Sequence, residues 1–180
     1  GISSTASHVK PIETPAPKAP PASAQSLTSL STAEDKIALF RRMFRGRDDV
    51  YAVRWRGKDG KAGYSPASLK NWDRRDAQGR PERTFLPLTN EAIQNHLTGR
   101  ETIGVYPLLP DETCWFLAAD FDKASWRDDT TAFLKTCGKY GVPAYLEISR
   151  SGNGGHVWIF FEQNVPGSLA RRLGAFLLTQ

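Results

Sequence analysis

Two aspartates, Asp120 and Asp122, stand at the end of an apolar segment, "TCWFLAADFD". In a β-strand, residues two positions apart face the same side with about 6–7 Å between their Cα atoms, so both carboxylates would project together. Like charges at this spacing repel each other, and a divalent cation removes that repulsion. Carboxylate oxygens of this kind suit Mg²⁺ or Mn²⁺ bound together with substrate phosphates. The pair therefore predicts a metal site, although two solvated aspartates at the start of a helix would give the same short motif.

A glycine-rich loop, "SRSGNGG", directly precedes His156 and the apolar segment "VWIFF". Its glycines allow backbone N–H groups to approach an anion closely, and the hydroxyls of Ser149 and Ser151 are further donors. His156 can donate a ring N–H to a phosphate oxygen. Taken alone, the loop is equally typical of an ordinary hairpin. Together with the aspartates, it predicts a site for a metal-bound triphosphate.

The elements that must position these residues follow in the order strand, helix, strand, strand, helix. They are expected at residues 113–122, 125–141, 143–149, 156–161 and 168–180. The first strand is almost entirely apolar, which predicts a central strand that is buried on both faces and forms a hairpin with residues 102–109. A strand–helix–strand crossover makes the first two strands parallel if they share a sheet, and the third returns antiparallel. The aspartates, the loop and His156 would then meet at one edge of the sheet, where ligands commonly bind.

The N-terminal part begins with residues 1–30, a Pro-, Ala- and Ser-rich stretch that predicts a flexible linker. A helix is expected to start at a capping box of Ser31 and Glu34 and to stop at Gly46. The other expected elements are strands at residues 51–55 and 62–67, a polar loop at 70–84 and a helix at 88–99.

These elements divide the chain into the linker, an N-terminal α/β subdomain over residues 31–100 and a second subdomain over residues 101–180. The second subdomain has the element order of a ferredoxin-like or RRM-like βαββα half without its last strand. We therefore expect an α+β fold that is truncated at its C-terminal end.

The composition supports a packed core, with 39% hydrophobic and 11% aromatic residues, and the net charge of +5 permits a polyanionic partner. Cys114 and Cys137 lie in apolar surroundings and are expected to be reduced core residues. No apolar segment is long enough to span a bilayer and no signal-peptide core is present, which predicts a cytoplasmic protein without a membrane partner.

At these same residues the chain resembles the archaeo-eukaryotic primase superfamily. Its first motif, an hhhDhD strand end, is matched by "FLAADFD", and its second, a Ser…His loop before a strand, by "SRSGNGGHVWIFF". Between residues 40 and 180, the stretches "GRDDVYAVRW", "GYSPAS", "FLPLT" and "TIGVYPLLPDETC" are similar to the primase-polymerase domains of bacterial TOTE conflict systems and to CRISPR-associated primase-polymerases.

The resemblance implies template-directed nucleotidyl transfer, that is, synthesis or extension of DNA or RNA primers by a two-metal mechanism. It makes Asp120 and Asp122 the catalytic ligands of two Mg²⁺ or Mn²⁺ ions. The residues that it implies for nucleotide binding are Ser149, Arg150, Ser151, Gly152, Asn153, Gly154 and His156. The third acidic motif of the family is expected beyond Gln180, and no zinc site is expected because residues 70–84 lack a cysteine cluster.

The expected partners are nucleoside triphosphates and a single-stranded DNA or RNA template. Arg47, Arg54 and Trp72 are the candidates for template contact, because cations neutralise the backbone and aromatic rings stack on bases. The resemblance further implies a bacterial cytoplasmic setting and a helicase or nuclease in the same system. Two other functions fit parts of the pattern: a metal-dependent nucleotide-sugar transferase with a D-x-D motif, and a catalytically inert RRM-like binder of single strands.

Overall fold

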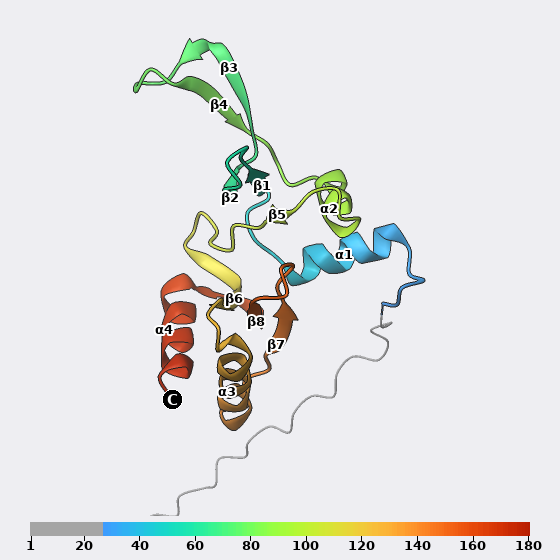
Figure 1. The fold of residues 1–180 in the computed structure, drawn as a ribbon, viewed down its shortest axis with the longest axis vertical. Coiled ribbons are helices and arrows are strands. Elements are labelled where there is room, and N and C mark those ends of the chain that lie inside the picture. The colour runs from blue at the N-terminus through green and yellow to red at the C-terminus, as the bar shows by residue number, and fades with distance from the viewer. Residues whose placement is uncertain (1–26) are drawn as a thin grey trace, which may run out of the picture. The chain divides into compact units, whose positions relative to one another are not determined.

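Residues 27–180 are described by the computed structural model, and within them four helices and eight strands form an α+β arrangement (Figure 1). The strands form three antiparallel sheets, in the orders β2-β1-β5, β3-β4 and β6-β8-β7. Residues 31–180 form one compact unit. Most of the expected linker, residues 1–26, lies outside the described residues.

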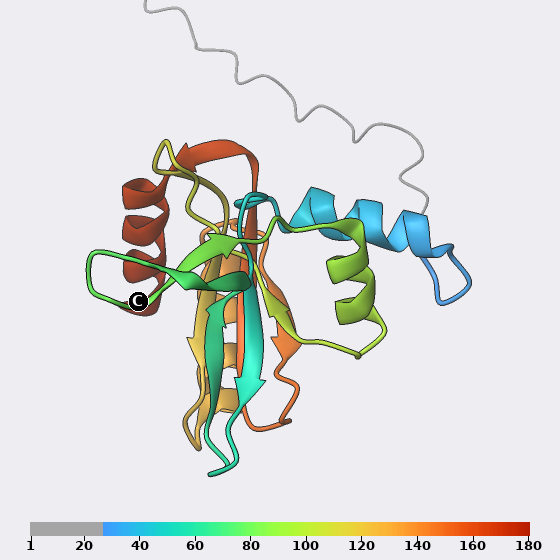
Figure 2. The same cartoon turned by 90° about the horizontal axis from the view of Figure 1, so that it is seen from above.

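The N-terminal half contains two helices and five strands. They are α1 (Ala33–Met43), β1 (Ala52–Arg56), β2 (Ala62–Pro66), β3 (Ser68–Arg75), β4 (Pro81–Phe85), α2 (Asn90–Leu97) and β5 (Ile103–Gly104). Helices α1 and α2 lie side by side, as Figure 2 also shows, and Ile37 and Ile93 are buried together with Ile103 in one core. The apolar residues of α1 are therefore spaced so that Ile37 and Phe40 face this core.

Helix α1 begins one residue later than the expected capping box. Its N-cap is Thr32, whose hydroxyl accepts the N–H of Asp35 at 3.1 Å and donates to the Asp35 carboxylate at 2.8 Å. Ser31 with Glu34, and Thr32 with Asp35, satisfy the same hydroxyl-x-x-acid spacing, so the pattern did not distinguish the two registers. The helix also ends at Met43, ahead of the expected stop at Gly46.

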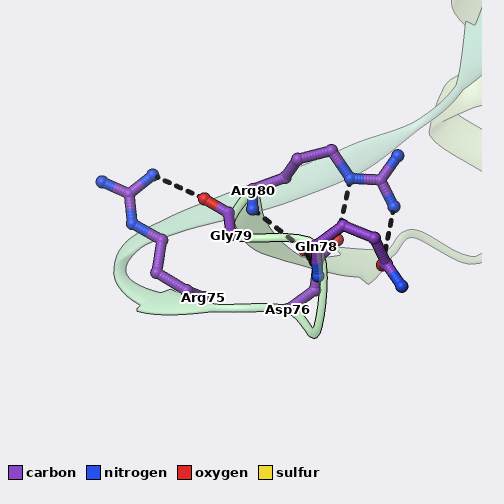
Figure 3. Close-up of polar contacts among 5 residues, drawn as sticks. All are labelled: Arg75, Asp76, Gln78, Gly79 and Arg80. Atoms are coloured by element: carbon purple, nitrogen blue, oxygen red, sulfur yellow. Dashed lines mark hydrogen bonds and ion pairs between the residues drawn. The ribbon is translucent and has the colours of Figure 1, made fainter.

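Residues 70–84 were expected to form a loop, and this prediction was wrong. They lie in the hairpin of β3 and β4, whose tip is closed by a turn from Asp76 to Arg80 (Figure 3). The Asp76 carboxylate accepts the backbone N–H groups of Gln78 at 3.0 Å and Arg80 at 2.9 Å, and Gly79 has a φ of +75°. The strands lack apolar alternation because almost all their residues are exposed, so periodicity carried no signal.

The expected hairpin between residues 102–109 and 113–122 is also absent from the described structure. Only Ile103 and Gly104 form a strand, β5, and it pairs with β1 because Ile103 is buried in the N-terminal core. Between β5 and the strand that begins at Thr113, the chain turns through Leu109 and Glu112, and the φ of Glu112 is +62°. The N-terminal sheet therefore includes residues beyond position 100.

The C-terminal half has the order of elements that the sequence predicts. They are β6 (Thr113–Phe121), α3 (Trp126–Lys139), β7 (Tyr145–Ile148), β8 (Gly155–Pro166) and α4 (Gly167–Leu178). However, β8 and not β6 is central, and β6 is an edge strand of this sheet. The two outer strands run parallel to each other with β8 between them, because each pairs antiparallel with β8.

The two faces of this sheet carry different packing. Helices α3 and α4 cover one face, where Val157 and Ile159 pack with Phe133, Cys137 and Leu177 (Figure 1). Free Cys137 and Cys114 are both buried, as expected, and burial raises the pKa of each thiol.

On the opposite face, Phe44, which follows α1, packs on aromatic rings of the sheet. Its ring centroid lies 5.0 Å from that of Trp158, 5.9 Å from that of Phe116 and 5.7 Å from that of Phe160. Strand β6 is thus apolar because both its faces have apolar neighbours, although it is not central.

Candidate active site

A row of three polar side chains crosses the sheet on the face that carries Trp158. Asp120 of β6 and Glu147 of β7 are both paired in register with His156 of β8. The Nε2 atom of His156 lies 3.5 Å from the Asp120 carboxylate, and Nδ1 lies 3.6 Å from Oε2 of Glu147. The imidazole is therefore flanked by one carboxylate on each neighbouring strand.

Asp122 follows the last residue of β6 and lies beside Lys123, whose Nζ is 3.7 Å from its carboxylate. The side chains of Asp120 and Asp122 are both 71% exposed. Solvent therefore reaches both carboxylates, which leaves their oxygens accessible to a ligand.

The glycine-rich loop between β7 and β8 packs against the end of β6. A Cβ atom on Gly154 would lie 2.9 Å from the carbonyl oxygen of Phe121 and 3.7 Å from Cα of Asp122. A side chain at this position would therefore separate the loop from the aspartate pair. Gly152 is required for another reason, since its φ of +74° is in the left-handed region.

Hydrogen bonds within the loop hold its two serines together. The hydroxyls of Ser149 and Ser151 are 3.1 Å apart, and the hydroxyl of Ser151 accepts the N–H of Asn153 at 3.2 Å. The N–H of Gly152 donates to the carbonyl of Ser149 at 2.8 Å. Both hydroxyls thus lie together in the loop that packs against the end of β6 through Gly154.

Four other predicted residues do not join this group. Arg150 donates from Nη1 to the Thr102 hydroxyl at 2.7 Å, in a contact with the N-terminal half. Arg47 forms an ion pair with Asp49, and hydrogen bonding to this guanidinium lowers the pKa of the Asp49 carboxyl. Arg54 lies on β1, while Trp72, which was assigned to a loop, lies on β3 and is 64% exposed.

Glu147 is a site residue that was not predicted from the sequence. Its carboxylate faces His156 and accepts the indole N–H of Trp158 at 2.8 Å. Tyr145 and Glu147 lie two positions apart in "YLEIS" and therefore face the same side of the strand, so this spacing could have indicated a polar position on one sheet face. The pairing of Glu147 with His156, in contrast, depends on strand register, which the spacing does not supply.

The donor set fits a hard divalent cation. Asp120 and Asp122 offer carboxylate oxygens, and two such ligands leave coordination positions for water and phosphate oxygens, as is common for Mg²⁺. Within residues 27–180, no group of three or more His, Cys, Asp and Glu side chains is arranged to hold a metal ion.

An α+β domain in which an Asp-x-Asp strand end faces a Ser…His loop has the organisation expected of an archaeo-eukaryotic primase. The family model described as "TOTE conflict system, Archaeo-Eukaryotic Primase domain" matches residues 35–180, and the chain belongs to this family. The match confirms the resemblance found in the sequence, and it indicates a nucleotidyl-transfer function of the primase-polymerase kind. Domains of this family generally use divalent metal ions.

Comparison with curated proteins gives no match. In the part of the chain that the structure describes, no helix combines the length and the apolar character needed to cross a membrane.

Proposed function

We propose that this chain provides the site for template-directed nucleotidyl transfer in the synthesis or extension of DNA or RNA primers. The observation that carries the proposal is the pairing of Asp120 with His156 in register, with the serine-containing loop packed against Asp122. Carboxylates for a cation and donors for phosphates thus occur within one small region. This is the combination that a metal-bound nucleoside triphosphate requires.

In this function, Asp120 and Asp122 hold Mg²⁺ or Mn²⁺, with two ions expected from the family. The chemistry that such ions would supply when bound is stabilisation of charge at the α-phosphate and activation of a 3′-hydroxyl. The hydroxyls of Ser149 and Ser151 and the imidazole of His156 bind the phosphates. Gly152 and Gly154 keep the loop close enough to do so, while Arg150 acts by tethering the loop through Thr102.

A single-stranded DNA or RNA template would lie on the N-terminal half. The exposed ring of Trp72, with Nζ of Lys70 at 5.6 Å from its centroid, suits stacking on a base next to a phosphate. Arg54 has an exposed side chain on β1. Arg47 is the weakest of the template candidates, because Asp49 already neutralises its charge. A helicase or nuclease in the same bacterial system remains the expected companion.

The other two functions have less support. An RRM-like binder would need several exposed rings on the sheet, whereas Phe44 packs over Trp158 and Phe160, which leaves Tyr145 of β7 as an exposed ring on that face. A nucleotide-sugar transferase accounts for the aspartates but assigns no role to the serine–histidine loop, and the family match favours the primase kind.

Titration with fluorescent dGTP and GTP, with and without Mn²⁺, tests the proposal. Metal-dependent binding is expected, and Asp122→Ala and His156→Ala should each abolish it. Asp128→Ala is the matched control, because Asp128 is an exposed aspartate on α3 outside the site. Displacement by UDP-glucose, or binding that is unchanged in both site variants, would contradict the proposal.

A further inference from the structure

His156 owes its orientation to contacts on both sides of β8. From β6, the Asp120 carboxylate lies 3.5 Å from Nε2, and from β7, Oε2 of Glu147 lies 3.6 Å from Nδ1. Asp120 belongs to the aspartate pair that would hold metal, whereas Glu147 lies on the far side of the ring. The two contacts therefore distinguish a ligand-facing nitrogen, Nε2, from a nitrogen that faces protein, Nδ1.

The Nδ1 atom is buried and has no hydrogen-bond partner among the described residues. Buried polar atoms in folded proteins are nearly always hydrogen-bonded, so an unpaired one calls for a partner close by. Oε2 of Glu147 is the acceptor beside it, and a shift of a few tenths of an ångström would bring the 3.6 Å separation into hydrogen-bond range. Glu147 is thus placed to accept a hydrogen bond from the Nδ1–H group of His156.

Glu147 is itself held by an anchored aromatic residue. Its Oε2 accepts the indole N–H of Trp158 at 2.8 Å. The indole is fixed in turn, because its ring packs edge-on against Phe44 at 5.0 Å and stacks with Phe160 at 6.4 Å between centroids. The glutamate side chain is 54% exposed, so this hydrogen bond is what restricts it on the edge strand.

We propose that Glu147 is a positioning residue, which is anchored by the Trp158 indole and fixes the His156 ring so that Nε2 faces the phosphates beside Asp120. The proposal rests on the proposed function for the identity of that ligand. For histidines that bind metal ions, removing the group that orients the ring through its second nitrogen typically costs about 10- to 100-fold in affinity or activity, and we expect an effect at the lower end of that range here.

The first test needs no nucleotide. In ¹H–¹⁵N spectra of the whole chain, the indole N–H signal of Trp158 is assigned with Trp158→Phe and the ring signals of His156 with His156→Ala. Glu147→Ala should shift both sets of signals, whereas Glu147→Gln, which keeps an acceptor oxygen for the indole, should shift them less. Glu162→Ala is the matched control, because it removes an exposed glutamate from β8 outside the row.

The second test measures Mn²⁺-dependent affinity for fluorescent dGTP. Glu147→Ala is expected to weaken binding about tenfold, with substantial recovery in Glu147→Gln. Because its effect passes through the His156 ring, Glu147→Ala should not weaken binding more than His156→Ala does. Since Glu147 is exposed at a sheet edge, its truncation leaves no core cavity, and circular dichroism checks that each variant is folded.

The outcomes separate this inference from the proposed function. Unchanged Trp158 and His156 signals in Glu147→Ala would overturn the positioning role, whatever happens to nucleotide binding. Shifted signals with unchanged affinity, in a protein that loses affinity on His156→Ala, would overturn it as well. If the unmodified chain binds no nucleotide, the proposed function fails, and the spectra alone decide whether Glu147 fixes the ring.

Discussion

At the scale of single residues, the two loop glycines at positions 152 and 154 are needed for different physical reasons. Gly152 has a φ of +74°, with open space where a Cβ would lie. Gly154 has no such angle, and a Cβ there would press on the carbonyl of Phe121. The first glycine meets a conformational requirement and the second a steric one.

These reasons predict different consequences of adding one methyl group. Gly154→Ala should displace the loop from Asp122 and reduce metal-dependent nucleotide affinity by about tenfold or more, because small misplacements in a site are costly. Gly152→Ala should instead lower stability by about 1–2 kcal/mol, the cost of left-handed backbone for a residue with a Cβ. Nucleotide titration and urea unfolding measure the two effects.

Gly138→Ala serves as the control, since it lies in α3 with no atom within 4 Å of the added Cβ. It should leave affinity unchanged and stability equal or higher, because alanine favours helix. Equal effects of Gly152→Ala and Gly154→Ala on nucleotide affinity would contradict the distinction.

Residue types together with the expected order of strands were sufficient to propose Asp120, Asp122, the serines and His156 as one group, and their role in binding stays a prediction. They were not sufficient for Glu147, because its role depends on which residue faces it across β8. They also did not show that Arg47 forms an ion pair with Asp49, two positions along the chain.

At the scale of elements, the β3–β4 hairpin depends on its turn. A two-stranded hairpin is marginally stable in water, and the strands here are mostly exposed. Asp76 contributes by accepting the N–H groups of Arg80 and Gln78, and these bonds hold the pKa of its carboxyl below the ordinary value of 3.8. The sequence "DAQG" carries this turn signal, with aspartate first and glycine last.

The depressed pKa of Asp76 predicts the direction of a pH effect. A carboxyl whose pKa is lowered on folding contributes stability above its unfolded value and loses it as the pH falls through the folded value. Order at the tip should therefore be constant from pH 7 to about 4 and decline below 3.8. Amide shifts of Gly79 and Arg80 report this order.

Asp76→Ala should abolish that pH dependence and leave the tip less ordered at neutral pH. Asp73→Ala is the comparison, because Asp73 is an exposed aspartate of the same hairpin outside the turn. An identical acid transition in Asp76→Ala would show that another group is responsible.

The exposed ring of Trp72 and the arginines of the N-terminal half lead to a prediction about the binding of single-stranded nucleic acid. Trp72→Ala should weaken binding of a single-stranded oligonucleotide by about 1–3 kcal/mol if a base stacks on the ring. Arg54→Ala should reduce both affinity and its salt dependence, whereas Arg47→Ala should do so less, because Asp49 already compensates its charge. Fluorescence anisotropy at several salt concentrations gives both quantities, and equal losses for the two arginines would refute the contrast.

At the scale of the whole described unit, side chains connect the two halves, among them the Arg45 guanidinium, which lies 4.3 Å from the ring centroid of Trp115. Phe44 comes from the segment after α1 and packs on Trp158 of β8, and Arg150 reaches Thr102. The order of elements in the C-terminal half was predictable, because each has its own apolar rhythm and stop signals. The order of strands in the sheet was not, because the apolar residues of β6 would suit a central strand as well as an edge strand that contacts Phe44.

Phe44→Ala should therefore affect both stability and the site. We expect a loss of about 2 kcal/mol in the free energy of unfolding, below the roughly 3–5 kcal/mol typical of fully buried phenylalanines. The indole N–H signal of Trp158 should also move. Phe176→Ala, at a partly exposed ring on α4, should leave that signal in place. Urea unfolding and the same ¹H–¹⁵N spectra measure these effects.

Strand β7 has four residues, all exposed, and it is hydrogen-bonded to a neighbour on one side only. Segments of this kind detach at a lower free-energy cost than the core, so β7 should exchange its amide hydrogens sooner than β8 does. Such a detachment would move Glu147 away from His156, whereas Asp120 lies on β6, which is also an edge strand but has nine residues and is partly buried, and would stay paired. Strand β7 would thus exchange between a paired and an unpaired state while β6 and β8 stay together. The paired fraction would grow when a bound ligand favours that state.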